Sequence, residues 1–187
     1  MHWNEHYNLR DKHAFLGASK FSWLRYDEEK LKDVFLNLEA KERGTKLHNL
    51  AKEHIELRMA MPHNNKTFNK YVNDCIKNNM QPEQILYYSS YAFGTADAIN
   101  YDESKKKLQI YDLKTGMTPA HMEQLQIYAA LFCLEYKVDP FAIEYDLRIY
   151  QNDEVIYGDI FSDDIQDIMN IICNFSSIIE TMEDELS

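Results

Sequence analysis

The sequence has few cysteines, and the three it has are widely spaced. Cys75, Cys133 and Cys173 form no CxxC pair, so they fit buried thiols in a reducing compartment better than a disulfide framework. Three cysteines are also too few for a four-cysteine iron–sulfur cluster. With 45% hydrophobic and 13% aromatic residues among 187, and without repeats or low-complexity segments, the chain is predicted to form one folded domain.

The sequence also lacks a long apolar run and a targeting segment. No stretch approaches the ~20 apolar residues of a membrane span. The first residues, Met1-His-Trp-Asn-Glu-His, contain neither the basic region nor the apolar core of a signal peptide. We therefore expect a cytoplasmic protein that has no membrane partner.

Basic residues are nearly missing from the last part of the chain. Residues 138–187 hold 13 acidic residues and one basic residue, whereas residues 1–137 hold 18 acidic and 19 basic residues. The net charge of −11 therefore arises in the C-terminal region, and the rest of the chain remains compatible with nucleic-acid binding. The acidic region is interpreted as a solubilising surface, with a partner-facing surface as the alternative.

Hydrophobic periodicity predicts helices, three strands, a helix, two strands and a final helix, which is an α/β (α+β) order. Expected helix boundaries rest on Ser19 as an N-cap, on a break near Gly44, and on Thr118 as an N-cap before Pro119. The expected helices span 19–24, 28–61, 68–80, 118–136 and 162–183, and the expected strands span 85–93, 95–101, 107–115, 141–150 and 154–159. The domain, 1–187, thus has a helical part to about 82 and a sheet-containing core from about 83.

Five polar residues in the middle of the chain form a spaced pattern. Asp97 is expected at the end of a short strand segment that follows Gly94. Asp112 and Lys114 are two apart on the next strand and so project from one face, and Gln124 and Tyr128 are four apart on one helix face. Taken separately, Asp97 could be an ordinary turn residue, Asp112 and Lys114 a structural pair, and Gln124 and Tyr128 part of a helix surface. Their order and spacing together are more specific for a functional site than any of these residues alone.

The chain here resembles the RecB-type branch of the PD-(D/E)XK nucleases. This family carries, in order, G-x-x-x-H on a helix, then G-x-x-D, D/E-x-K and Q-x-x-x-Y. The corresponding segments here are Gly44-Thr-Lys-Leu-His48, Gly94-Thr-Ala-Asp97, Asp112-Leu-Lys114 and Gln124-Leu-Gln-Ile-Tyr128. The opening helix of the family also resembles Ala18-Ser-Lys-Phe-Ser-Trp-Leu24, and the resemblance covers roughly residues 13 to 150. It is similar in particular to small stand-alone phage or prophage exonucleases.

The resemblance implies a restriction-endonuclease-like core, with a mixed central sheet flanked by helices, and a metal site. Asp97, Asp112 and the Leu113 carbonyl would be ligands of Mg²⁺ or Mn²⁺, because hard oxygen ligands suit these ions. His48 would add an imidazole, which favours Mn²⁺ somewhat. Glu83 matches a further acidic position of the family only loosely.

The resemblance also assigns roles to the remaining motif residues. Lys114 would orient or help to deprotonate the attacking water and offset phosphate charge, and Gln124 and Tyr128 would touch the DNA backbone. Members that carry an iron–sulfur cluster have a cysteine just after the opening helix, where this chain reads Arg25-Tyr-Asp27, and only Cys173 lies near the C-terminus. No such cluster is therefore expected.

Basic residues flank His48 on its predicted helix and are the candidates for phosphate contacts. They are Lys41, Arg43, Lys46 and Lys52. The alternative is a solvated helix face on which they pair with Glu39, Glu42, Glu53 and Glu56. In either case Glu53 and Glu56 are interpreted as solvated helix residues.

The sequence leads to the hypothesis of a metal-dependent DNA exonuclease that serves phage recombination or DNA repair in a bacterial or phage-infected cell. The alternatives are a nuclease-fold protein that binds DNA or a partner without catalysis, and a structure-specific endonuclease. Strand preference, a recombination or helicase partner and homo-oligomer formation stay open.

Overall fold

The computed structural model describes residues 5–9 and 12–186, which divide into two compact units, Met1–Arg43 and Gly44–Ser187. The first unit contains the 3₁₀ helices η1 (Tyr7–Leu9) and η2 (Ala18–Arg25) and the beginning of α1 (Glu28–Glu56). Within it, the Trp23 indole donates to the carbonyl oxygen of Gly17 at 3.0 Å. The prediction that Ser19 caps the short helix is wrong: Gly17 holds the N-cap position, without a side-chain cap.

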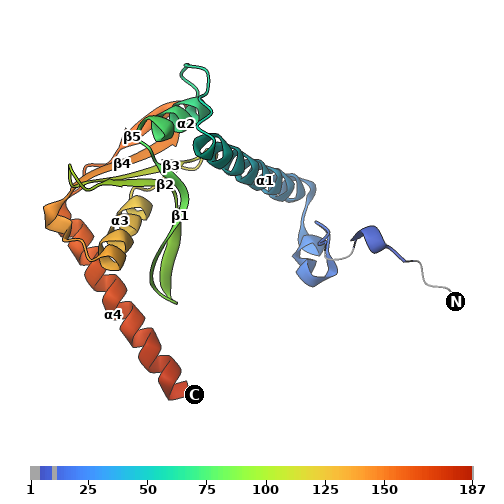
Figure 1. Ribbon diagram of the computed structural model, residues 1–187. Coiled ribbons are helices and arrows are strands. Elements are labelled where there is room, and N and C mark those ends of the chain that lie inside the picture. The colour runs from blue at the N-terminus through green and yellow to red at the C-terminus, as the bar shows by residue number, and fades with distance from the viewer. Residues whose placement is uncertain (1–4, 10–11, 187) are drawn as a thin grey trace. The chain divides into compact units, whose positions relative to one another are not determined.

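The second unit is built on a five-stranded mixed sheet in the order β1-β2-β3-β4-β5 (Figure 1). The strands are β1 (Gln81–Ser89), β2 (Ala92–Asp102), β3 (Lys107–Leu113), β4 (Glu144–Gln151) and β5 (Glu154–Tyr157). All neighbours are antiparallel except β3 and β4, which are parallel. A parallel pair needs a crossover connection, which α3 (Glu123–Tyr136) and η3 (Pro140–Ala142) supply.

Helices cover both faces of this sheet. Helices α3 and α4 (Ser162–Leu186) enclose one core against the strands, which includes Leu86, Ile110, Leu125, Leu147 and Ile165. The end of α1 and α2 (Thr67–Lys77) enclose a second core, which includes Ile55, Val72, Tyr111, Leu113 and Tyr150. The mixed helix-and-strand class expected from the sequence is confirmed, as is a mixed sheet with flanking helices.

Several expected boundaries are wrong for identifiable reasons. Helix α1 passes through Gly44 without a break; the residue is buried, and a Cβ there would lie 2.8 Å from Thr115 Oγ1. The β1–β2 turn lies before Ala92, so Gly94 is inside β2 rather than between strands. Helix α3 begins at Glu123, with Met122 at its N-cap, so Thr118 and Pro119 precede the helix.

The connection before α3 is held by a contact that is distant in sequence. The buried side chain of Gln151, on β4, donates to the carbonyl oxygens of Gly116 at 2.7 Å and Thr118 at 2.8 Å. If the helix began at Thr118, the carbonyl groups of Gly116 and Thr118 would turn away from Gln151 and lose these hydrogen bonds.

Among the described residues, no helix combines the length and apolar character that crossing a bilayer requires.

Candidate metal and phosphodiester site

The candidate site forms where the β1–β2 hairpin is irregular. Ala96 and Ile99 lie in the core beneath α3, whereas Ala98 lies in the opposite core, so the alternation of β2 shifts by one residue at Asp97. Across the ladder, Glu83 adopts a left-handed backbone conformation with φ 50°. Asp97 is therefore inside β2, and its expected place at a strand end is wrong.

Helix α1 supplies the histidine of the site. Ala51 and Ile55, one and two turns further along α1, are buried in the second core and fix this end of the helix against the sheet. His48 Nδ1 thereby lies 3.3 Å from Asp97 Oδ2. The hydrogen bond with Asp97 raises the pKa of His48 against the opposing effect of burial.

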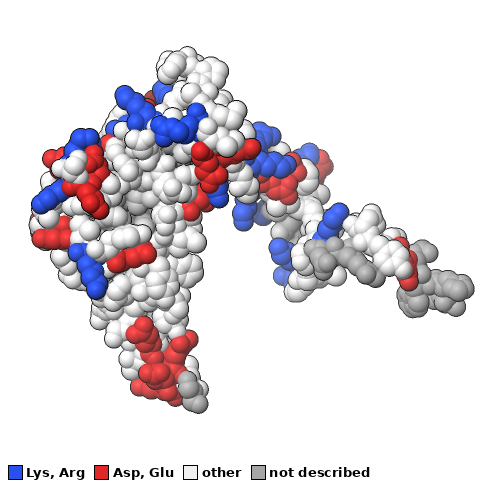
Figure 2. Space-filling model, in the orientation of Figure 1, with Lys and Arg blue, Asp and Glu red and all other residues white. Residues whose placement is uncertain are grey.

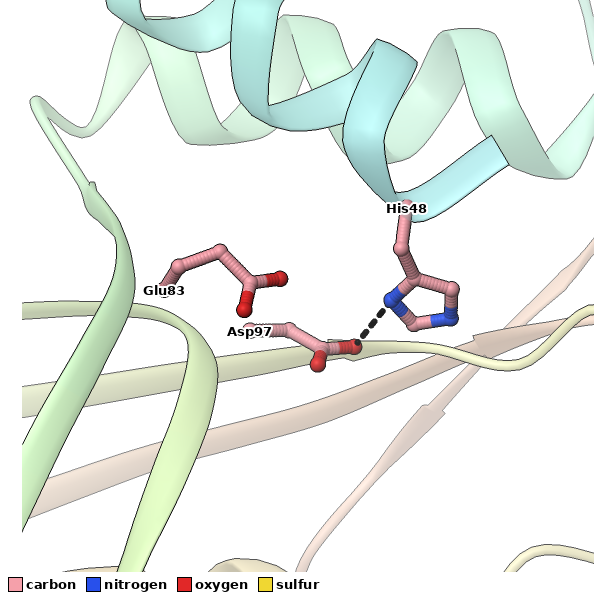
Figure 3. Close-up of side chains that lie close together, drawn as sticks. All are labelled: His48, Glu83 and Asp97. Carbon is pink, nitrogen blue, oxygen red and sulfur yellow. Dashed lines mark ion pairs between the residues drawn. The ribbon is translucent and has the colours of Figure 1, made fainter. Parts of the chain in front are cut away.

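Three potential metal ligands converge at this point, as Figure 3 shows. One ligand atom from each of His48, Glu83 and Asp97 lies within 4.8 Å of the others. The residues come from α1, β1 and β2, so the cluster joins three elements. Burial and the nearby Asp97 charge raise the pKa of Glu83 against the opposing effect of His48 and Lys52, because both burial and a like charge disfavour the ionised carboxylate.

A second set of polar residues forms a hydrogen-bonded chain from β3 to α3. Lys114 Nζ donates to Asp112 Oδ1 at 3.1 Å and to Gln124 Oε1 at 2.8 Å. Gln124 Nε2 in turn donates to the Tyr128 hydroxyl at 3.0 Å. The four residues of two sequence motifs are thus brought into one contiguous network.

Asp112 is the buried carboxylate of that network. Its side chain is 2% exposed, and Oδ2, although 3.0 Å from Lys114 Nζ, has no hydrogen-bond partner. Burial, reinforced by the Asp97 charge, raises the pKa of Asp112 to about 6. The Lys114 ammonium compensates the charge of this oxygen, but Oδ2 accepts no hydrogen bond, and a buried carboxylate oxygen of this kind is a ligand type that suits a metal ion.

The two parts of the site are tied together through the backbone of Leu113. Its N–H donates to Asp97 Oδ2 at 2.9 Å, and its side chain is buried in the second core. The same Asp97 oxygen therefore meets His48 and the end of β3. The carboxylate and imidazole donors of His48, Glu83 and Asp97 suit Mg²⁺ or Mn²⁺, and these are the residues that would hold the ion. Asp112 is not part of this group of ligand atoms.

Gly94 has a packing role at the site. A Cβ at this position would lie 2.9 Å from Cε1 of the Tyr128 ring. Because Gly94 has no side chain, β2 can pack directly against the Tyr128 ring. In this position the Tyr128 hydroxyl lies within hydrogen-bonding distance of Gln124. Burial raises the pKa of Tyr128 above its ordinary value.

The candidate phosphate-contacting residues lie on α1, on both sides of His48 in the sequence. Lys46 is exposed, and Lys52 Nζ lies 3.9 Å from Glu56 Oε1. Lys41 and Arg43 belong to the first unit and are exposed. Glu53 and Glu56 are exposed, as the sequence predicted, and the Lys52–Glu56 pair agrees with the alternative of an ion-paired helix face for that position.

The three cysteines are not among the candidate metal ligands. Cys75 is buried in the second core and Cys133 in the first, while Cys173 is partly exposed on α4. Burial raises the pKa of the Cys133 thiol to about 11. The expectation of buried thiols is thus confirmed for two of the three cysteines.

Comparisons with protein-family models, with curated proteins and with solved structures gave no match. The structure adds Glu83 to the set that the sequence favoured. Its signal in the sequence was faint, because an acid after Gln81-Pro82 is also typical of a turn, and only the pairing of β1 with β2 brings it opposite Asp97.

Proposed function

We propose that this chain is a metal-dependent nuclease that hydrolyses DNA phosphodiester bonds. The observation that carries the proposal is the union of the His48, Glu83 and Asp97 cluster with a buried, donor-poor Asp112 that lies against Lys114. If Asp112 and Lys114 formed only a structural ion pair, that would account for the contact between these two residues and for nothing else in the site. It would not explain three further ligand side chains placed beside a strained backbone at Glu83.

Each residue has a chemical task in this proposal. His48, Glu83 and Asp97 would hold a divalent ion, and Asp112 would be a further ligand; the ion would supply Lewis acidity toward a phosphoryl oxygen and lower the pKa of water. Lys114 orients the attacking water and offsets phosphate charge. Gln124 fixes the position of Lys114, and Tyr128 fixes Gln124. Attack forms a bond from the water oxygen to phosphorus and breaks the bond to the leaving ester oxygen, which takes up a proton.

The element order supports assignment to the RecB-type branch of the PD-(D/E)XK nucleases. An antiparallel β1-β2-β3 meander, a crossover helix and a parallel β4 agree with the restriction-endonuclease-like core that the motifs imply. All four motifs lie at or beside the site, because Gly44 and His48 are on α1 and Gly94 packs under Tyr128. Within this assignment we favour an exonuclease that acts in phage recombination or DNA repair.

A cleavage assay tests the proposal. Linear and covalently closed circular DNA, each single- and double-stranded, are incubated with the full-length protein and Mg²⁺ or Mn²⁺, and a parallel set contains excess EDTA. An exonuclease degrades the linear forms only, and EDTA abolishes the reaction. Cleavage of circles would replace the exonuclease with an endonuclease. Cleavage that persists in EDTA would remove the metal site, and DNA binding without any cleavage would favour a non-catalytic binder.

A further inference from the structure

Helix α4 is apolar on its buried face and also along the flank beside that face, where large side chains are exposed. The inner face contributes Ile165, Ile168, Met169 and Ile172 to the core beneath α3. Further along, Ser176 on this face is buried and its hydroxyl lies 3.0 Å from that of Ser89 on β1. These contacts fix the rotation of the helix and therefore determine which residues point away from the unit.

One flank of the helix carries a continuous stripe of large apolar side chains, which we name the α4 stripe. It consists of Ile171, Phe175, Ile178 and Met182, which are 51%, 58%, 49% and 55% exposed. Their spacing of four, three and four residues is that of a helix seam which packs against a partner. Scattered exposed apolar residues are normal on a protein surface, but a contiguous row along a helix marks an interaction site.

The charged residues of α4 are all of one sign. Helix α4 contains seven acidic residues, Asp163, Asp164, Asp167, Glu180, Glu183, Asp184 and Glu185, and no basic residue. Figure 2 shows acidic side chains gathered at the C-terminal end of α4. Acidic residues at a helix C-terminus oppose the helix dipole and so cost stability in the isolated chain, whereas a cationic partner would turn this charge into attraction.

We propose that the α4 stripe docks a protein partner that presents an apolar groove bordered by lysine and arginine. A second copy of α4 fits poorly. In a parallel pair the acidic C-terminal ends meet, and in an antiparallel pair that aligns the two stripes Glu180 to Glu185 lie against residues 168–173, next to Asp167 of the other helix. Neither arrangement offers a basic residue of α4 to compensate, and like charges across an interface are unfavourable.

The proposal goes beyond nuclease chemistry and is tested by peptide binding to the full-length protein. The probe is a fluorescent helical peptide with leucine at heptad positions a and d and lysine elsewhere, and its charge-reversed twin carries glutamate in place of lysine. Fluorescence anisotropy should give a Kd for the lysine peptide at least about tenfold lower than for the glutamate peptide. The double substitution Phe175→Gln, Ile178→Gln should raise the Kd for the lysine peptide at least about tenfold.

Two controls make the result decisive. Ile127→Gln removes an equally accessible apolar side chain, 43% exposed, on α3 and should bind as the unsubstituted protein does. Met182→Gln provides a milder stripe variant if the double variant melts early. The proposal is overturned if the stripe variants bind the lysine peptide normally, or if both peptides bind equally well. It is also overturned if sedimentation shows a dimer that the stripe variants abolish, since a second copy would then cover the face.

Discussion

At the scale of single residues, Asp112 lowers the stability of the folded protein in a way that a bound metal ion would offset. The carboxylate is buried, one oxygen lacks a donor, and its pKa is raised to about 6. The folded, metal-free protein therefore disfavours the ionised form relative to the unfolded chain. The resulting destabilisation is absent below the unfolded pKa of about 4 and is fully present above the folded pKa.

Asp112→Asn should therefore stabilise the metal-free protein at neutral pH by on the order of 2 kcal/mol. The gain in the free energy of unfolding should grow as the pH rises from about 4 to 7. Urea denaturation at several pH values, in the presence of EDTA, measures it. A variant that is less stable than the parent throughout this range would show that Asp112 serves the fold rather than a cation.

The individual ligands should differ in their effect on metal affinity. His48→Ala removes one neutral ligand and leaves the carboxylates, so we expect the Kd for Mn²⁺ to rise roughly tenfold. Asp97→Asn removes a charge while keeping a carbonyl oxygen for the Leu113 N–H, so its Kd should rise further. Calorimetric titration measures both values, with Asp102→Asn as a control at an exposed turn. Unchanged affinity in Asp97→Asn would remove that residue from the site.

At the scale of elements, the close approach of β2 to α3 sets the geometry of the network. Gly94→Ala places a Cβ 2.9 Å from the Tyr128 ring, so Tyr128 must shift and the bonds to Gln124 and Lys114 are disturbed. We expect a fall in kcat of about tenfold or more, since misplacement of catalytic groups is costly. Gly116→Ala is the matched control, because a Cβ there meets nothing within 4 Å. Equal rates for the two variants would contradict this role of Gly94.

The elements also show what local sequence could and could not predict. Strand and helix types were predictable, because periodicity of two and 3.6 residues separates them. The residue at which α3 starts could not be predicted, because hydrogen bonds from Gln151 on β4 hold the connection that precedes the helix. The continuity of α1 through Gly44 could not be predicted either, because the glycine is explained by its close packing against Thr115 and not by a break in the helix. The spaced sequence motifs predicted most residues of the candidate site, but the place of Glu83 in it became clear only from the pairing of β1 with β2.

At the scale of the whole molecule, charge is distributed unevenly along the chain. If the basic residues of α1 follow the DNA backbone, the substitutions Lys46→Glu and Lys52→Glu should raise the KM for DNA. They should also reduce the slope of log affinity against log salt by about 0.9 for each phosphate that is no longer neutralised. The substitutions Asp163→Lys and Asp164→Lys on α4 should have much smaller effects. Salt titrations of DNA binding compare the two pairs, and a larger effect from α4 would reverse the placement of the DNA path.

The most direct test of the central claim is the single-turnover rate of cleavage of linear duplex DNA in Mn²⁺. The proposal predicts that Lys114→Ala and Asp112→Ala each lower this rate at least about 100-fold, while their circular dichroism spectra match that of the parent. Lys105→Ala, which removes a lysine paired with Asp102 at an exposed turn, should cleave at the parental rate. Parental rates in Lys114→Ala and Asp112→Ala would contradict the assignment of this cluster as a nuclease site.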